Sequence, residues 1–152
     1  MTKRNTVHAT FVIERDYAHA PSKVFDAFAN PQSKVKWFGG PDEWEKSNHK
    51  LDFRIGGKES VSGGPPGGTV HAYNAAYWDI VPNERIVTSY QMHLDKQRIS
   101  VSLATMEFKA NGAGTTFVLT EQGAFLDGYD DAGGREHGTR ELLNNLETFL
   151  KA

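Results

Sequence analysis

Residues 99–122 read ISVSLATMEFKANGAGTTFVLTEQ, and this stretch decides the fold. Apolar and polar side chains alternate on both sides of a turn at Asn111-Gly112-Ala113-Gly114. The alternation predicts two strands, Ile99–Lys109 and Thr115–Gln122. Because so short a connection joins neighbouring antiparallel strands, the stretch predicts a β-hairpin with one mainly apolar face.

The same alternation recurs upstream of this hairpin. Short glycine- or proline-containing connectors separate the segments, so the chain predicts an antiparallel meander. One connector, residues 63–68 (GGPPGG), predicts a loop at a sheet end and not a phosphate cradle, because no helix follows it. The four further predicted strands are His49–Ile55, Lys58–Ser62, Thr69–Val81 and Arg85–Leu94.

A long helix is predicted downstream, over residues 130–150. Its apolar side chains recur at helical spacing and form one stripe, while charged and amide side chains occupy the opposite face. Such a stripe has to be buried, and the concave side of the sheet is the only large apolar partner in the chain. The stripe consists of Leu142, Leu143, Leu146, Phe149 and Leu150.

The N-terminal part adds one strand at Val7–Tyr17 and two short helices. The first helix is predicted over Ala20–Ala29, with Pro21 at its first turn, and the second over Pro31–Trp37. The complete order predicts an α+β protein with a helix-grip fold. About seven antiparallel strands curve around a long C-terminal helix, and two short helices follow the first strand. We expect residues 1–152 to form a single domain.

Composition excludes several functional classes. The chain has no cysteine, which rules out disulfides, thiolate nucleophiles and zinc–sulfur sites. Its net charge is −2 and no basic stripe is present, so we expect no nucleic-acid partner. No apolar stretch is long enough to span a membrane, and residues 1–8 lack the apolar segment of a signal peptide. We therefore expect a cytoplasmic protein.

Six segments, spread in order over almost the whole chain, resemble the SRPBCC superfamily, also called START-like or birch-pollen-allergen-like. Within it they resemble the branch of the activator of the heat-shock-protein-90 ATPase homologue, or polyketide cyclase-like proteins. The resemblance implies a helix-grip fold with a cavity; members range from hydrophobic-ligand binders to cyclases and co-chaperones. Where the family often has Gly-Trp, this chain has Gly138-Thr139, which removes one bulky side chain near the cavity. The segments are RDYAHAPSKVFDAF (15–28), WFGGP (37–41), LDFRIGGK (51–58), DIVPNERIV (79–87), GTT (114–116) and LLNNL (142–146).

The candidate catalytic residues are Glu121 and His71. Alternation from Phe117 and Leu119 carries Glu121 toward the helix-covered face, where an apolar environment would raise the pKa of its carboxyl group. The alternative interpretation is that Glu121 lies beyond the buried zone or pairs with an arginine. The histidines show no metal-binding spacing, and no cofactor motif is present, so we expect neither a metal nor a cofactor.

A ligand site is predicted from aromatic and small polar side chains that alternation or the fold's entrance places near the hollow. Its function would be to bind a small hydrophobic molecule. One alternative is a cofactor-independent enzyme of cyclase or hydrolase type that uses an inward-facing Glu or His. Another is a chaperone-associated or homodimerising module that uses the outer face or an edge of the sheet. The predicted ligand-binding residues are Trp37, Phe38, Trp44, Tyr73, Tyr90, Met92, Ser102, Phe117 and His137.

Overall fold

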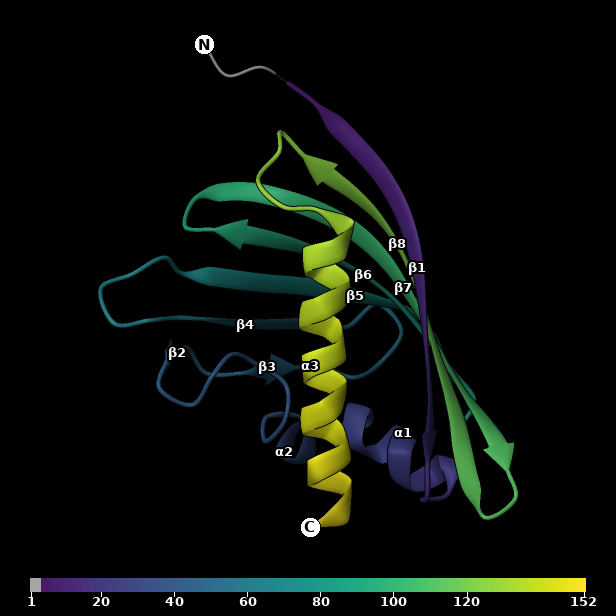
Figure 1. The fold of residues 1–152 in the computed structure, drawn as a ribbon. Coiled ribbons are helices and arrows are strands. Elements are labelled where there is room, and N and C mark those ends of the chain that lie inside the picture. Colours follow the sequence, from purple (N-terminus) through teal and green to yellow (C-terminus); the bar gives the residue numbers. More distant parts are fainter. Residues whose placement is uncertain (1–3) are drawn as a thin grey trace.

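The computed structural model describes residues 4–152 (Figure 1), so the first three residues of the N-terminal stretch lie outside the described part. Within residues 4–152, seven strands and three helices follow one another in the predicted order, and one further short strand, β2, was not predicted. The bounds are β1 (Thr6–Tyr17), α1 (Pro21–Ala29), α2 (Pro31–Lys34), β2 (Glu45–Lys46), β3 (Lys50–Leu51), β4 (Lys58–Gly64), β5 (His71–Val81), β6 (Arg85–Leu94), β7 (Gln97–Asn111), β8 (Gly114–Leu126) and α3 (Ala132–Lys151).

All eight strands form one antiparallel sheet in the order β1-β8-β7-β6-β5-β4-β2, and β3 also pairs with β4. β1 forms one edge of the sheet and pairs with β8 along its whole length, from Thr6 opposite Leu126 to Tyr17 opposite Thr115. The sheet curves around α3, with α1 and α2 at its lower end (Figure 1). The predicted helix-grip architecture is therefore confirmed.

Two predicted elements are shorter than expected. The predicted strand His49–Ile55 pairs only at Lys50–Leu51, because the chain then folds back on itself: Asp52 N donates to Lys58 O and Gly57 N donates to Arg54 O. The second helix ends at Lys34 instead of continuing to Trp37, and the chain leaves it through a turn. The first of these segments is held by hydrogen bonds to β4 and β5, with Asp52 N donating to Lys58 O and Gly56 N to Tyr77 O.

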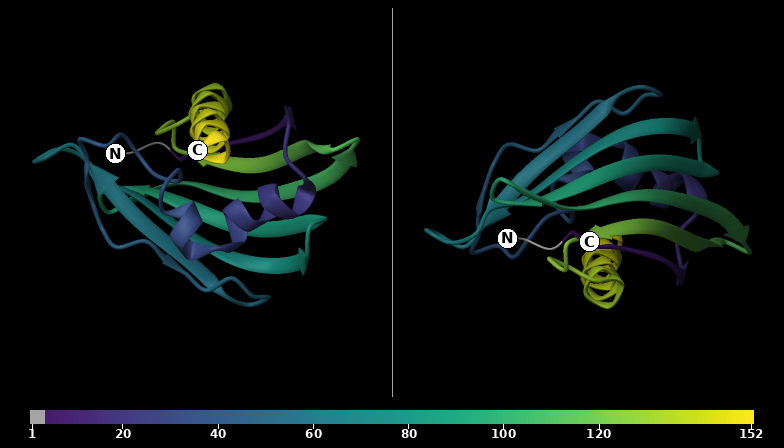
Figure 2. Two further views of the ribbon diagram at one scale, coloured as in Figure 1. Left: turned by 90° about the horizontal axis from the view of Figure 1, so that it is seen from below. Right: turned by 90° about the horizontal axis from the view of Figure 1, so that it is seen from above.

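The core lies between α3, α1 and the concave face of the sheet. α3 packs over β1 and against α1 (Figure 2), and its Leu143, Leu146 and Leu150 are buried. Four aromatic rings meet beneath it: Phe28 stacks on Phe117 at 5.4 Å, and Phe25 and Phe108 pack edge-on at 5.3 Å. None of the helices in residues 4–152 combines the length and apolar character needed to cross a membrane.

Candidate functional site

The concave face above this core is lined by rows of side chains from β5 to β8. Tyr73 stands opposite Met92, which stands opposite Ser100; in the next row Tyr90 stands opposite Ser102. Because cross-strand partners share a face, these five side chains all point toward α3. The two serines are buried, whereas Tyr73, Tyr90 and Met92 are half-buried and form the reachable surface of this face.

The first polar cluster joins α3 to the sheet. Glu121 on β8 is buried and accepts a hydrogen bond of 2.8 Å from the Tyr90 hydroxyl. Arg135, on the first turn of α3, donates to the hydroxyl oxygens of Tyr90 at 3.1 Å and Ser100 at 2.7 Å, and to Asp130 at 3.1 Å. Its guanidinium lies 3.7 Å from the Glu121 carboxylate. Arg135 therefore connects the first turn of α3 to β6 and β7, in the middle of the sheet.

Burial is the main influence on the carboxyl group of Glu121. Loss of solvation raises its pKa, although the hydrogen bond from Tyr90 and the positive charge of Arg135 partly oppose the rise. The predicted inward orientation of Glu121 agrees with the structure. The arginine partner that the alternative interpretation required is present as well, so Glu121 is both an inward carboxyl group and one half of an ion pair.

The second polar cluster centres on Glu59 of β4. Its Oε1 accepts hydrogen bonds from Lys34 at 2.7 Å and from the Tyr77 hydroxyl at 2.6 Å. Its Oε2 lies 2.6 Å from Nε2 of His49. The side chains of Lys34, His49 and Glu59 are all almost completely buried, and the Lys34 ammonium lies 4.4 Å from the centre of the Phe38 ring.

The surroundings of Glu59 keep it ionised. Burial alone would raise its pKa, but the positive charge of Lys34 and hydrogen bonds from His49, Lys34 and Tyr77 hold that pKa at about 2. An ionised carboxylate only accepts, so His49 Nε2 carries the proton that is donated to it. The other ring nitrogen, His49 Nδ1, is buried and has no hydrogen-bond partner among the described residues.

Tyr73 lies between the two clusters. Its ring is 4.9 Å from the ring of Tyr90 and 5.0 Å from that of Phe38. Burial raises the pKa of Tyr73 well above its usual value, and the negative charges of Glu59 and Glu121 raise it further, so its hydroxyl stays protonated. The structure records no hydrogen-bond partner for this hydroxyl within residues 4–152.

The other predicted site residues fall into three places. Trp37 and Phe117 are fully buried core residues, and the Trp37 indole donates to Ala27 O. Trp44 stacks on His71 at 4.8 Å, away from the polar clusters, and no described contact joins His71 to Glu121. His137 lies on the exposed side of α3, 3.0 Å from Glu141. The predicted residues that do come together are Phe38, Tyr73, Tyr90, Met92, Ser102 and Glu121.

Sequence reasoning missed several charged or polar members of the two clusters: Arg135, Ser100 and Asp130 in the first, and Glu59, Lys34, His49 and Tyr77 in the second. Arg135 shares the helix face of Leu142 and Leu146, which is a signal the sequence does carry. Glu59 and Val61 lie on the same face of β4. Because Val61 stands opposite Tyr73 on β5, Glu59 faces inward like Tyr73 and is its diagonal neighbour. Lys34 and His49 follow no pattern, because they sit at the end of a short helix and in an irregular segment.

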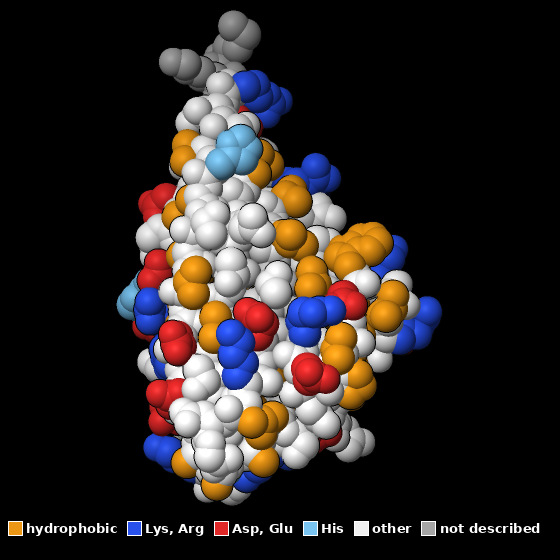
Figure 3. Space-filling model, turned by 90° about the vertical axis from the view of Figure 1, so that its right-hand side faces the viewer, with side chains coloured by type: hydrophobic (Ala, Val, Ile, Leu, Met, Phe, Trp, Pro, Cys, Tyr) orange, Lys and Arg blue, Asp and Glu red, His pale blue; other side chains and the backbone are white. Residues whose placement is uncertain are grey.

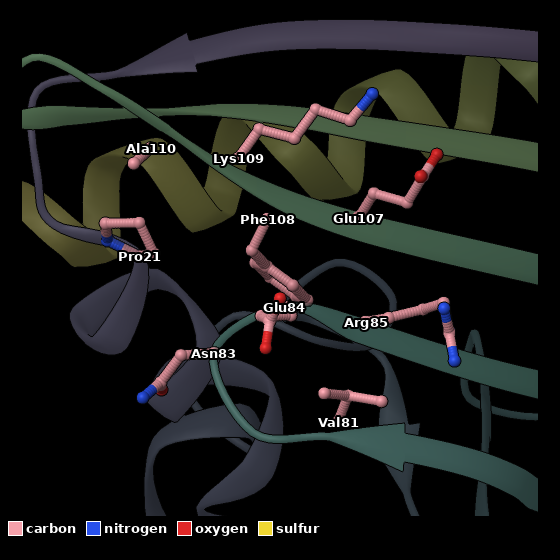
Figure 4. A pocket seen from close by; sticks show the side chains of 9 residues that line it. All are labelled: Pro21, Val81, Asn83, Glu84, Arg85, Glu107, Phe108, Lys109 and Ala110. Atoms are coloured by element: carbon pink, nitrogen blue, oxygen red, sulfur yellow. The ribbon is translucent and has the colours of Figure 1, made fainter.

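Two surface hollows lie elsewhere. One, of about 430 Å³, opens where the β5–β6 turn meets the start of α1, and charged side chains such as Glu84, Arg85 and Lys109 surround it (Figure 4). The other, of about 600 Å³, is a shallow trough beside exposed Val101 and Leu103 on the outer side of β7. The outer side of the sheet shows hydrophobic groups scattered among polar and charged ones (Figure 3).

Within residues 4–152, no three His, Asp or Glu side chains are grouped to hold a metal ion.

Comparison with known proteins places the chain among bacterial relatives. The model of the family described as "Activator of Hsp90 ATPase homolog 1-like protein" matches residues 18–151. An uncharacterized protein from Rhizobium leguminosarum is 47% identical over 99% of both chains, and its structure has a TM-score of 0.93. The protein Mll3558 from Rhizobium loti is 43% identical over 95% of this chain and 99% of its own, with a TM-score of 0.89.

More distant structures share the fold alone. Protein CV1439 from Chromobacterium violaceum has a TM-score of 0.75 at 22% identity, over 94% of this chain and 97% of its own. No curated protein matches the chain. The names of these three proteins specify no ligand, reaction or partner.

Proposed function

Because this chain belongs to the activator of Hsp90 ATPase homolog 1-like family of the SRPBCC superfamily, we propose that it binds a small, mainly apolar molecule on the concave face beneath the first turns of α3. The observation that carries this proposal is the half-buried group Tyr73, Tyr90 and Met92, which stands directly beside the buried Glu121–Arg135 pair. A few fixed polar groups among aromatic and thioether side chains are typical of small-molecule sites.

The unequal burial of the concave face supports this choice of site. Toward its lower end the face is filled by the rings of Phe28, Phe108 and Phe117, which leave no room for a ligand. Toward the start of α3, Ser100 and Ser102 are small, and Tyr73, Tyr90 and Met92 are only half-buried.

The test uses the methionine methyl groups as reporters. With ¹³C-methyl methionine, Met92 reports on the concave face, and buried Met106 reports on the core below it. A panel of small aromatic and aliphatic compounds should include some that shift the Met92 signal, leave that of Met106 nearly unchanged and raise the melting temperature, since a ligand specific for the native state stabilises it. A panel that moves neither signal nor melting temperature would refute the proposal.

A second candidate function is acid–base catalysis by Glu121, which its raised pKa and its contact with the Tyr90 hydroxyl favour. In that case Glu121→Gln would abolish turnover of a bound compound while retaining its binding. The matched control is Glu141→Gln, on the exposed side of α3. Equal turnover in wild type and Glu121→Gln would leave Glu121 as a structural partner of Arg135.

A further inference from the structure

All charged side chains in the two clusters are already paired inside the protein. Arg135 has both of its terminal nitrogens in use, with Tyr90, Ser100 and Asp130 as acceptors and Glu121 at 3.7 Å. Lys34 is paired with Glu59 at 2.7 Å. A ligand ion would therefore lose its water of hydration without gaining a free counter-charge among the described residues, which is unfavourable.

A neutral polar group between the two clusters has no hydrogen-bond partner among the described residues: the Tyr73 hydroxyl. Tyr73 is half-buried, and its ring lies between the rings of Tyr90 and Phe38. A phenol both donates and accepts, so it matches a hydroxyl or a carbonyl oxygen on a ligand. Leaving such a group unpaired under an apolar ligand carries a free-energy penalty that a complementary oxygen removes.

We infer that the ligand of the concave face is uncharged and carries a hydroxyl or carbonyl oxygen on an otherwise apolar skeleton, and that this oxygen hydrogen-bonds to the Tyr73 hydroxyl. The inference rests on the proposed function and adds the ligand's chemical class and its specificity-determining residue. Tyr73 holds the ligand's oxygen, while the paired charges around it, Glu59–Lys34 and Glu121–Arg135, exclude ligand ions.

The test compares four probes that share one ring system: 2-naphthol, naphthalene, 2-naphthoate and 2-naphthylmethylammonium. Dissociation constants are measured by calorimetry at pH 7, and the Met92 methyl signal confirms the site of binding. Wild type should bind 2-naphthol about five-fold more tightly than naphthalene, the usual effect of one neutral hydrogen bond. Both ions should bind at least about ten-fold more weakly than 2-naphthol.

The variant Tyr73→Phe keeps the ring and its packing but lacks the hydroxyl. It should bind 2-naphthol and naphthalene equally, whereas Tyr129→Phe, which alters an exposed tyrosine, should keep the wild-type preference. Circular dichroism and melting temperature establish that each variant is folded.

The outcomes separate the two claims. Tightest binding of either ion, or an undiminished preference for 2-naphthol in Tyr73→Phe, would overturn the inference but leave ligand binding in place. If none of the four probes binds or shifts the Met92 signal, the inference fails; if the broader panel is also inactive, the proposed function fails with it.

Discussion

Glu59 and Glu121 are both buried carboxyl groups on the concave face, but their environments act in opposite directions. Glu59 receives hydrogen bonds from Lys34, Tyr77 and His49, which outweigh the effect of burial and lower its pKa to about 2. Glu121 has Tyr90 close by and Arg135 at 3.7 Å, so burial prevails and its pKa is raised. The number and closeness of donors decide whether the pKa of a buried carboxyl group falls or rises.

Replacing Glu59 by glutamine should strongly destabilise the protein. The variant leaves the Lys34 ammonium buried without a counter-charge. This should lower the free energy of unfolding by about 3–5 kcal/mol. Urea unfolding at pH 7 measures the loss. Asp52→Asn, which removes an exposed partner of Arg54, is the control and should cost less than about 1 kcal/mol. Equal losses in the two variants would contradict the buried ion pair.

The lowered pKa of Glu59 also predicts how stability depends on pH. Between its unfolded value near 4.5 and its folded value of about 2, the unfolded chain binds more protons than the folded one. The contribution of Glu59 is therefore fully present above pH 4.5 and is lost as the pH falls toward 2. It amounts to about 3 kcal/mol. Urea midpoints from pH 2 to 7 should show this loss in wild type; the same slope in Glu59→Gln would assign it to other groups.

At the scale of elements, α3 depends on its contacts more than on its own sequence. The helix contains Gly133, Gly134 and Gly138, each of which weakens an isolated helix. Asp131 caps its start by accepting a hydrogen bond of 2.7 Å from Gly134 N, and Arg135 attaches the first turn to the sheet. The remaining stabilisation comes from the buried leucine side chains.

Leu146→Ala should therefore destabilise the protein by about 2–5 kcal/mol, the usual range for a truncated core leucine. Leu146 is completely buried in the core beneath α3. Leu103→Ala, on the outer side of β7, is the control and should have a much smaller effect, because its side chain is 39% exposed. Equilibrium unfolding of both variants gives the comparison. A loss below about 0.5 kcal/mol for Leu146→Ala would contradict the packing of α3.

At the scale of the whole molecule, the sheet has a stable centre and weak ends. β7 and β8 pair with each other and have partners on both outer sides, β6 and β1. β2 and β3 are two residues long and pair only with β4. The buried Glu59 cluster lies on β4, next to this weaker end of the sheet. The side chains at that end include the Phe38 and His49 rings near Tyr73.

Hydrogen exchange should reproduce this gradient. Amides in the ladder between β7 and β8, such as that of Val118 opposite Glu107, should exchange only through global unfolding, because both strands are held on each side. The amides of Ser47 and Asp52, which donate to Ser62 O and Lys58 O of β4, should exchange faster by at least about a hundred-fold, through local opening. Two-dimensional NMR after transfer to heavy water measures both classes. Equal protection in the two regions would mean that the short strands open only with the whole sheet.

Strand and helix periodicity determined most of the fold from the sequence. Alternation in residues 99–122 and the apolar stripe of α3 each depend on local spacing, so they predicted both the hairpin and the helix that covers it. The same alternation predicted the inward direction of Glu121, Tyr90 and Ser102. The strand at residues 49–55 was mostly wrong, because its course depends on hydrogen bonds to β4 and β5 and not on its own pattern.

Only the tertiary structure decided how the concave face is charged. Lys34, His49 and Glu59 lie in three separate segments, and Arg135 reaches Ser100 across 35 residues of sequence, so no local spacing reveals these contacts. The spacing of residues along the sequence predicts which face of a strand or helix a side chain occupies. The pairing of buried charges depends on distances between strands and helices, which that spacing does not give. For the same reason the sequence predicted Tyr73 among the site residues, but only the folded chain shows that its hydroxyl stands unpaired between two neutralised clusters.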